Sequence, residues 1–129
     1  DATCKAVHLV QKGPRFTGCI SDLTGPTEEG LVPSCRALVA PIEMATGQKA
    51  YFIGKPNPLM VRTGLKMLGV HSQDAAIIGD RMDTDIVAGI ESGLDTLLVL
   101  SGVTSQEELE RFPYRPRLVL GGVGEIPPQ

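Results

Sequence analysis

The first part of the chain shows hydrophobic and polar positions at helical spacing in two places. Apolar residues three and four apart predict helices over residues 2–12 and 33–46, with a short strand over residues 15–20 between them. Pro41 lies inside the second helix, removes one backbone donor and predicts a kink or an early stop there. Residues 21–30 are rich in Gly, Pro, Asp and Glu, a composition typical of a loop.

A different pattern begins at residue 51, where short apolar runs alternate with amphipathic helical segments. The runs do not alternate apolar with polar residues, and such strands are typical of a parallel sheet that helices cover on both faces. We therefore expect an α/β fold with a Rossmann-like parallel sheet, and a domain boundary near residue 49. The predicted strands cover residues 51–53, 75–78, 96–100 and 117–120, and the predicted helices cover residues 57–68, 83–92 and 105–111.

Composition limits the class of protein. With 42% hydrophobic and 21% charged residues, the chain is typical of a globular protein. A net charge of −3 offers no basic surface to nucleic acid, and no apolar run approaches the ~20 residues that span a bilayer. The chain has no signal-peptide pattern and three widely spaced cysteines, so we expect a cytoplasmic protein without nucleic-acid or membrane partners. Because the first residue is Asp1 and not Met, we expect the natural N-terminus to be missing or processed.

Candidate chemistry gathers where the predicted strands end, because ligands of such sheets bind beyond the carboxyl ends of the strands. Lys55 follows one strand and precedes the expected helix cap Asn57, so its ammonium and the free amides of the helix start suit a phosphate. Asp80 follows the next strand, and Asp85 lies in the first turn of the helix after it. Mg²⁺ usually takes one or two protein carboxylates, so we expect it at Asp80, with Asp85 as a direct or indirect partner. Asp83 is expected to cap that helix.

Taken singly, each of these features is common, since a Gly-Asp pair suits any turn and acidic residues favour the start of any helix. Their order along the chain is more specific, and it resembles a known family. The segments GKPNP (54–58), IIGDRMDTDIVAGIESG (77–93) and TLLVLSGVT (96–104) resemble the third and fourth motifs of haloacid dehalogenase (HAD) phosphatases. Together with LTGPTEEGLVP (23–33) and ERFPYRPRLVL (110–120), they are most similar to the NagD-like, p-nitrophenylphosphatase branch.

The resemblance implies an activity and a cofactor. It implies a Mg²⁺-dependent phosphatase that hydrolyses a small-molecule phosphate ester, such as a sugar phosphate, a nucleotide or p-nitrophenyl phosphate, through an aspartyl-phosphate. Lys55 would be the catalytic lysine that binds the phosphoryl group and neutralises the nucleophile. Asp80 and Asp85 would bind the metal. Electrostatic stabilisation by a lysine and Mg²⁺ is what so charge-dense a transition state requires.

The resemblance also assigns the two parts of the chain. Residues 1–49 would be the C-terminal part of an α/β cap domain, and residues 50–129 the C-terminal half of the HAD-like core. Where the cap of the family usually has Thr-Asn-Pro-Asp, this chain has CISD at residues 19–22. Only Asp22 carries over, as a candidate substrate-binding residue.

The family's nucleophile lies in an Asp-x-Asp pair after the first strand, and this sequence has no such pair. Its only Asp-x-Asp, at residues 83–85, opens a helix. We therefore expect a fragment that is inactive alone and that associates with itself or with a missing N-terminal half. Two alternatives remain open. One is a non-catalytic HAD-like binding or interaction module, and the other is a receiver-like signalling domain, in which Lys55 would precede Asp80 in the wrong order.

Overall fold

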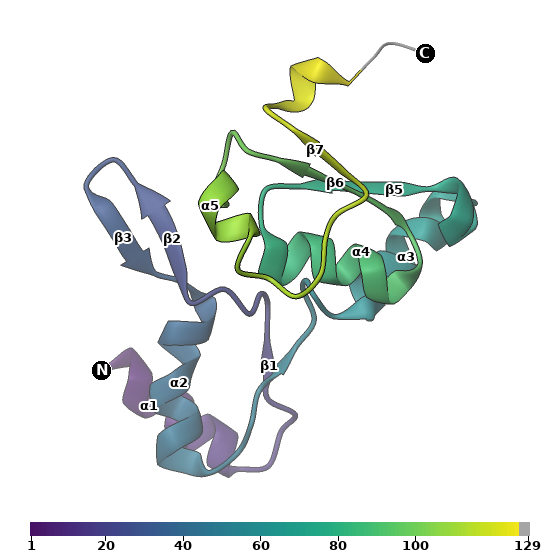
Figure 1. The fold of residues 1–129 in the computed structure, drawn as a ribbon. Helices are drawn as coiled ribbons and strands as arrows, with labels where there is room; N and C mark the ends of the chain where they lie inside the picture. Colours follow the sequence, from purple (N-terminus) through teal and green to yellow (C-terminus); the bar gives the residue numbers. More distant parts are fainter. Residues whose placement is uncertain (127–129) are drawn as a thin grey trace. The chain divides into compact units, whose positions relative to one another are not determined.

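The chain folds as two compact units, Asp1–Gly54 and Lys55–Gln129, in a computed structural model that describes residues 1–126. In Figure 1 the first unit runs from purple to blue and the second from teal to yellow. Both units combine helices with strands, in agreement with the expected α/β class. In the part of the chain that the structure describes, no helix has the length and apolar character needed to cross a membrane.

The two helices expected in the first unit are present. Helix α1 (Ala2–Gln11) begins at Asp1, which supplies its N-cap. Helix α2 (Cys35–Thr46) ends at Gly47, which adopts the left-handed conformation that favours glycine. Pro41 lies inside α2, but the helix continues beyond it, so the early stop does not occur. Helix α1 packs on α2.

Four short strands complete the first unit, and two of them contradict the predicted loop over residues 21–30. Strand β2 (Thr24–Thr27) pairs antiparallel with β3 (Gly30–Pro33) in a hairpin. The prediction was wrong because Gly and Pro are rare in strands on average, whereas an exposed two-stranded ribbon has room for both. Strand β1 (Thr17–Gly18) pairs in parallel with β4 (Tyr51–Phe52), which places β4 in this unit and not in the sheet that follows.

A buried carboxylate links the helical and strand parts of the first unit. Glu43 of α2 accepts hydrogen bonds from the Arg36 guanidinium at 2.7 Å and from the Ala50 N–H at 2.8 Å. The Arg36 guanidinium also lies 5.2 Å from the centre of the Phe52 ring, within cation–π range. The hydrogen bond from Ala50, followed by the contact with Arg36, lowers the pKa of Glu43 from its ordinary value of 4.5 against the opposing effect of burial.

A three-stranded parallel sheet forms the centre of the second unit. Its strands are β5 (Ala76–Gly79), β6 (Asp95–Val99) and β7 (Leu118–Leu120), and they lie side by side in sequence order. The parallel arrangement inferred from the unbroken apolar runs is therefore confirmed. Because neighbouring strands point the same way, their carboxyl ends meet at one edge of the sheet.

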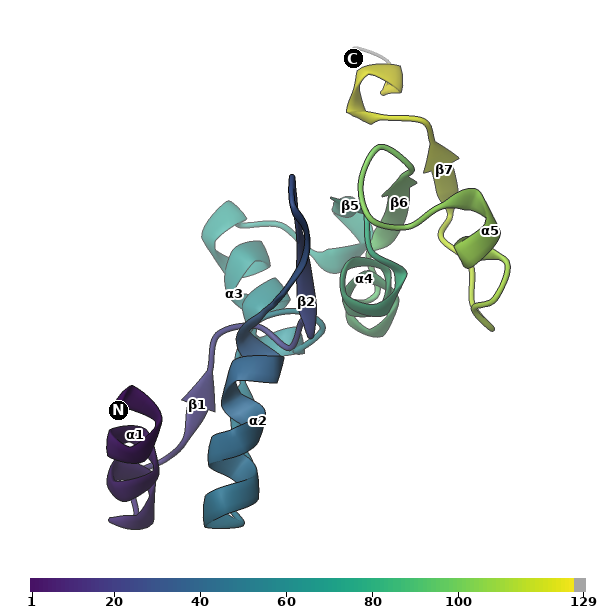
Figure 2. The same cartoon turned by 90° about the vertical axis from the view of Figure 1, so that its left-hand side faces the viewer.

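The helices of the second unit lie together on one face of this sheet (Figures 1 and 2). Helix α3 (Pro58–Leu68) packs beside α4 (Val87–Ser92), and α5 (Gln106–Leu109) follows β6. The shorter turns are η1 (Ser72–Asp74), the π-helical turn η2 (Met82–Ile86) and η3 (Val123–Glu125). The core between the helices and the sheet is formed by Met82, Ile86, Leu98 and Leu109.

The opposite face of the sheet has an uncovered row of apolar side chains within this unit. The strand register pairs Ile78 with Leu97 and Leu97 with Leu118, and Ile78 and Leu118 are each 46% exposed. In the described part of the chain, β5 also has a neighbouring strand on one side only. The expectation of helices on both faces is thus wrong for this unit, because the apolar strands call for a second layer that the unit does not contain.

We expect the Glu43 contacts to make stability depend on pH in the acid range. A carboxylate whose pKa is lowered by folding contributes stability above its unfolded pKa and loses it as the pH falls through the folded pKa. The stability difference between the original protein and Glu43→Gln should therefore stay constant above the ordinary value of 4.5 and shrink below it. Urea unfolding followed by circular dichroism at neutral and acid pH measures this difference. The matched control is Glu28→Gln in the exposed hairpin turn, and an identical pH dependence in both variants would contradict the role of Glu43.

Candidate active site

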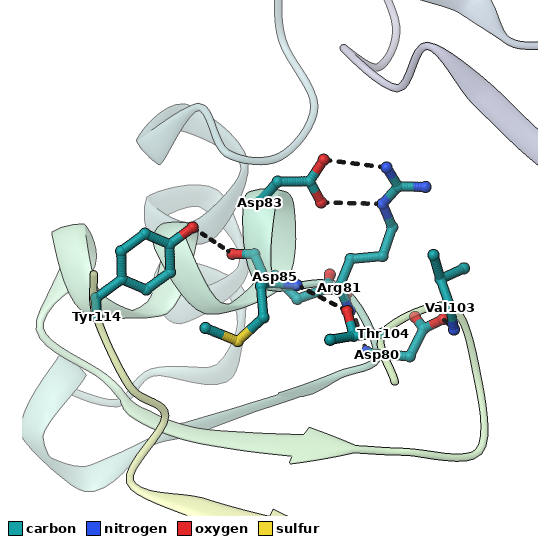
Figure 3. Close-up of polar contacts among 8 residues, drawn as sticks. Asp80, Arg81, Asp83, Asp85, Val103, Thr104 and Tyr114 are labelled. Atoms are coloured by element: carbon teal, nitrogen blue, oxygen red, sulfur yellow. Dashed lines mark hydrogen bonds and ion pairs between the residues drawn. The ribbon is translucent and has the colours of Figure 1, made fainter. Parts of the chain in front are cut away.

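The predicted site residues of the second unit meet at the carboxyl edge of its sheet. Asp80 directly follows β5, and the segment after the neighbouring strand β6 lies next to it. Figure 3 shows Asp80 beside Val103 and Thr104 of that segment. Lys55 forms an ion pair with Asp85, and Asp85 in turn contacts the backbone of Asp80. The structure thus brings together three of the four residues predicted from the sequence.

Asp85 is the centre of this arrangement. Asp85 is only 2% exposed, and its Oδ1 oxygen pairs with the Lys55 ammonium. Its Oδ2 oxygen accepts the N–H of Asp80 at 3.2 Å and the N–H of Arg81 at 3.1 Å. A buried carboxylate costs free energy unless it is paired and hydrogen-bonded. Both oxygens of Asp85 meet that condition within this unit.

A π-helical turn carries Asp85 into this position. In η2, the Ile86 N–H donates to the Arg81 carbonyl at 3.2 Å, five residues earlier in the chain and not four. The single helix predicted over residues 83–92 is therefore a π turn followed by α4, and such turns recur at functional sites. Gly79 permits the close approach, because a Cβ at this position would overlap the Asp85 carboxylate.

Asp83 contacts a neighbouring guanidinium and does not cap a helix. Its carboxylate is 55% exposed and accepts hydrogen bonds from Nε and Nη2 of Arg81 at 3.2 Å and 3.1 Å. Figure 3 shows both of these bonds. The cap prediction for Asp83 is wrong because the two donors of Arg81 compete for the same carboxylate.

The Asp80 carboxylate is held through one oxygen. Asp80 is half-buried, and its Oδ2 accepts the Val103 N–H at 2.8 Å. In the part of the chain that the structure describes, the hydrogen bonds to this carboxylate all reach Oδ2. Within that part of the chain Oδ1 accepts no hydrogen bond, so it is the oxygen better suited to a ligand.

Two side chains that the sequence did not reveal brace the π turn at Met82. Thr104 Oγ1 accepts the Met82 N–H at 3.3 Å, and the Tyr114 hydroxyl donates to the Met82 carbonyl at 3.1 Å. Burial, and secondarily the Asp83 carboxylate, raises the pKa of Tyr114, so its hydroxyl stays protonated and able to donate. The segment SGVT after a predicted strand is a signal that could have pointed to Thr104, whereas no local pattern marks Tyr114.

Asp80 and Asp85 fit part of a magnesium site. Mg²⁺ usually takes one or two protein carboxylates and completes its shell with waters and substrate phosphate. Asp80 Oδ1 suits direct contact, whereas both oxygens of Asp85 are engaged, so Asp85 suits an indirect role. Across residues 1–126, no three His, Cys, Asp or Glu side chains form a group that could hold a metal ion. Two carboxylates, Asp80 and Asp85, are within the number of protein ligands that Mg²⁺ usually takes.

Asp22, the fourth predicted site residue, belongs to the first unit. It lies in the connection between β1 and β2, where its carbonyl accepts the Arg36 N–H at 3.0 Å. Its contact with a substrate stays a prediction.

Comparison with known proteins identifies the family. A family model described as HAD-hydrolase-like matches residues 52–126, which are more than half of the chain. The chain belongs to the HAD-like hydrolase family. This family membership agrees with the resemblance of its motifs.

Similar HAD-like proteins match almost the whole chain. Dihydroxyacetone phosphatase of Corynebacterium glutamicum is 42% identical over 126 residues, which are 98% of this chain and 46% of that protein. The solved structure of NagD from Escherichia coli K-12 matches with a TM-score of 0.85 and 39% identity, over 97% of this chain and 49% of NagD. A glycerol phosphate phosphatase of Mycobacterium tuberculosis, solved in complex with magnesium, matches with a TM-score of 0.82 and 31% identity, over 91% of this chain and 36% of that one. The NagD-like resemblance is confirmed, and the chain spans about half the length of the curated relatives it matches.

We expect Asp85→Asn to destabilise the fold more than Asp83→Asn, although the two residues share one turn. Asparagine at position 85 would leave the Lys55 ammonium without its buried counter-charge. Loss of hydrogen bonds to a charged group costs about 2 kcal/mol, whereas an exposed ion pair such as that of Asp83 contributes less than about 1 kcal/mol. Urea unfolding of both variants at neutral pH measures the two losses. Equal losses would contradict the central position of Asp85.

Proposed function

We propose that this chain is part of a Mg²⁺-dependent phosphatase that hydrolyses small phosphomonoesters. The observation that carries the proposal is the grouping of Lys55, Asp80 and Asp85 at the carboxyl edge of a parallel sheet in a HAD-like chain. The relatives reported above are named as phosphatases, and one was solved with magnesium. The proposed substrates are of the sugar phosphate, nucleotide or p-nitrophenyl phosphate type.

The chemistry follows from compensation of phosphate charge. Lys55 immediately precedes the start of α3, where Asn57 caps the helix and the helix dipole is positive. Its ammonium is partly exposed while Asp85 holds it, so it can contact a phosphoryl oxygen without losing its orientation. When bound, Mg²⁺ supplies further stabilisation of negative charge on the phosphoryl oxygens. Asp80 Oδ1 is the protein oxygen best suited to hold it.

The nucleophile is proposed to come from outside these 129 residues. Asp83 is paired with Arg81 at the surface, and Asp85 is buried against Lys55, so neither carboxylate suits attack on a phosphate ester. An aspartyl-phosphate would then form on an Asp of another segment. This chain alone would bind a cation and an anion without turnover.

The remaining assignments extend the same proposal. Residues 1–49, which lie within the unit Asp1–Gly54, would act as the C-terminal part of a cap, with Asp22 as a substrate-binding residue. Residues 50–129 would be the C-terminal half of the core, although the compact unit begins at Lys55. The edge of β5 and the uncovered row at Ile78 favour a partner that adds a strand, either an N-terminal half or, without it, a second copy.

We expect full-length protein to hydrolyse members of a phosphate-ester panel only with Mg²⁺, and Asp80→Asn to impair this more than Asp83→Asn. Loss of a ligating oxygen should raise the Mg²⁺ concentration for half-maximal activity by more than the roughly 10- to 100-fold that loss of an indirect partner costs. Asp83→Asn alters an exposed pair and should change it by no more than about twofold. Steady-state assays across a Mg²⁺ series, with EDTA as the blank, measure these effects. Absence of hydrolysis for every ester would favour a non-catalytic binding module, and equal effects of the two substitutions would refute Asp80 as the ligand.

We expect the isolated 129-residue chain to self-associate and to hydrolyse no p-nitrophenyl phosphate. An apolar edge strand presents unpaired N–H and C=O groups to another chain. Multi-angle light scattering should therefore find dimers or larger species, and an N-terminal half added in trans should reduce them. Ile78→Lys, which places a charge on the uncovered face, should also reduce association, with Lys66→Glu on exposed α3 as the control. A monodisperse monomer with a cooperative melt would overturn this expectation.

A further inference from the structure

The orientation of the Asp80 carboxylate depends on residues Ser101–Thr104, the 101–104 loop, which follow β6. The Val103 N–H donates to Asp80 Oδ2 at 2.8 Å, and the Thr104 N–H donates to the Asp80 carbonyl at 3.0 Å. The loop therefore holds both the side chain and the main chain of Asp80. Figure 3 shows Val103 and Thr104 beside this residue.

Gly102 lets the loop lie this close to Asp80. A Cβ at residue 102 would overlap Oδ2, Cγ and Cβ of Asp80. Gly102 does not have a positive φ, so the requirement for glycine is one of space and not of backbone conformation. At Gly124 in the same unit, a Cβ would meet nothing within 4 Å.

Thr104 ties the same loop to the π turn. Thr104 is 5% exposed, and its hydroxyl accepts the Met82 N–H. The Tyr114 hydroxyl donates to the carbonyl of the same Met82. Hydrogen bonds thus connect the 101–104 loop both to the π turn and to Asp80. Movement of the loop would carry the Asp80 carboxylate with it.

The hydrogen bond from Val103 decides which oxygen of the Asp80 carboxylate faces a ligand. An unrestrained carboxylate can rotate and offer either oxygen or both to a cation. With Oδ2 held by the Val103 N–H, Asp80 presents Oδ1 in one orientation. Partners that orient a ligating side chain in this way strengthen metal binding.

We propose that the 101–104 loop positions Asp80 for Mg²⁺, with Gly102 and Thr104 as the positioning residues. This inference rests on the proposed function, because that function makes Mg²⁺ the ligand of Asp80. If the loop had only a structural role, substitutions in it would lower the unfolding temperature but leave the metal affinity of the folded protein unchanged. Metal affinity measured well below the unfolding temperature therefore separates the two roles.

The first experiment compares Gly102→Ala with Gly124→Ala in the full-length protein. Mn²⁺ serves as the probe for the Mg²⁺ site, and electron paramagnetic resonance of the free ion gives its Kd without turnover. We expect Gly102→Ala to raise the Kd about 10- to 100-fold and Gly124→Ala to leave it unchanged. In assays, the Mg²⁺ concentration for half-maximal activity should rise in Gly102→Ala, while the substrate KM at saturating Mg²⁺ changes less.

A second pair of variants tests Thr104 independently. Thr104→Val keeps the shape of the side chain but removes the acceptor for the Met82 N–H, whereas Thr104→Ser keeps the hydroxyl. The Mn²⁺ affinity should fall in Thr104→Val and should stay within about threefold of the original in Thr104→Ser. Equal affinities in the two variants would remove Thr104 from the proposal.

Asp80→Asn separates failure of this inference from failure of the proposed function. If Asp80→Asn does not weaken Mn²⁺ binding, the proposed metal site is wrong and the inference falls with it. If Asp80→Asn weakens binding and folded Gly102→Ala does not, only the positioning role is overturned. If Gly102→Ala does not fold, the comparison of Thr104→Val with Thr104→Ser decides.

Discussion

A negative charge in a nearly water-free position has to be matched by donors, and at Asp85 this requirement organises the second unit. Its two oxygens take an ammonium from the segment before α3 and two backbone N–H groups from the segment after β5. The carboxylate therefore joins the start of a helix, the end of a strand and a π turn at one point. If water could reach Asp85, the same contacts would hold these three elements together much more weakly.

The elements with local signals could be predicted from the sequence. The helix predicted over residues 57–68 matches α3, because the cap chemistry of Asn57 acts within one turn and can be recognised from neighbouring residues alone. The apolar run at residues 96–100 is also a local signal. Successive side chains of a strand point to opposite faces of the sheet, so an unbroken apolar run indicates burial on both faces, which is typical of a parallel strand. Asp80 could be proposed because it follows the well-marked strand β5, and Lys55 because it precedes the cap of α3, although the strand before Lys55 lies outside the sheet.

The features that the sequence did not reveal depend on partners far away in the chain or on competition between close ones. Tyr114 donates a hydrogen bond to Met82, 32 residues earlier in the chain, and the residues next to Tyr114 give no pattern that predicts this bond. Asp83 looked like a cap because acidic residues favour helix starts, but Arg81 offered it two donors at once. The hairpin at residues 24–33 depends on pairing between two strands, and composition alone reports only average preference.

The order of the strands in the second unit also bears on how it folds. Strands β5, β6 and β7 are neighbours in space in the same order as in sequence, and the Lys55–Asp85 pair closes a loop of 30 residues. Loop-closure entropy rises only slowly with loop length, and sheets whose strands are neighbours in sequence order have a lower contact order than sheets with distant pairings. The amides of Asp80 and Arg81 donate to the buried Asp85 carboxylate, so they are shielded from solvent once this edge has formed. A parallel strand added by a longer protein would pair with the lateral edge of β5, and the carboxyl end of that strand would then lie beside Asp80.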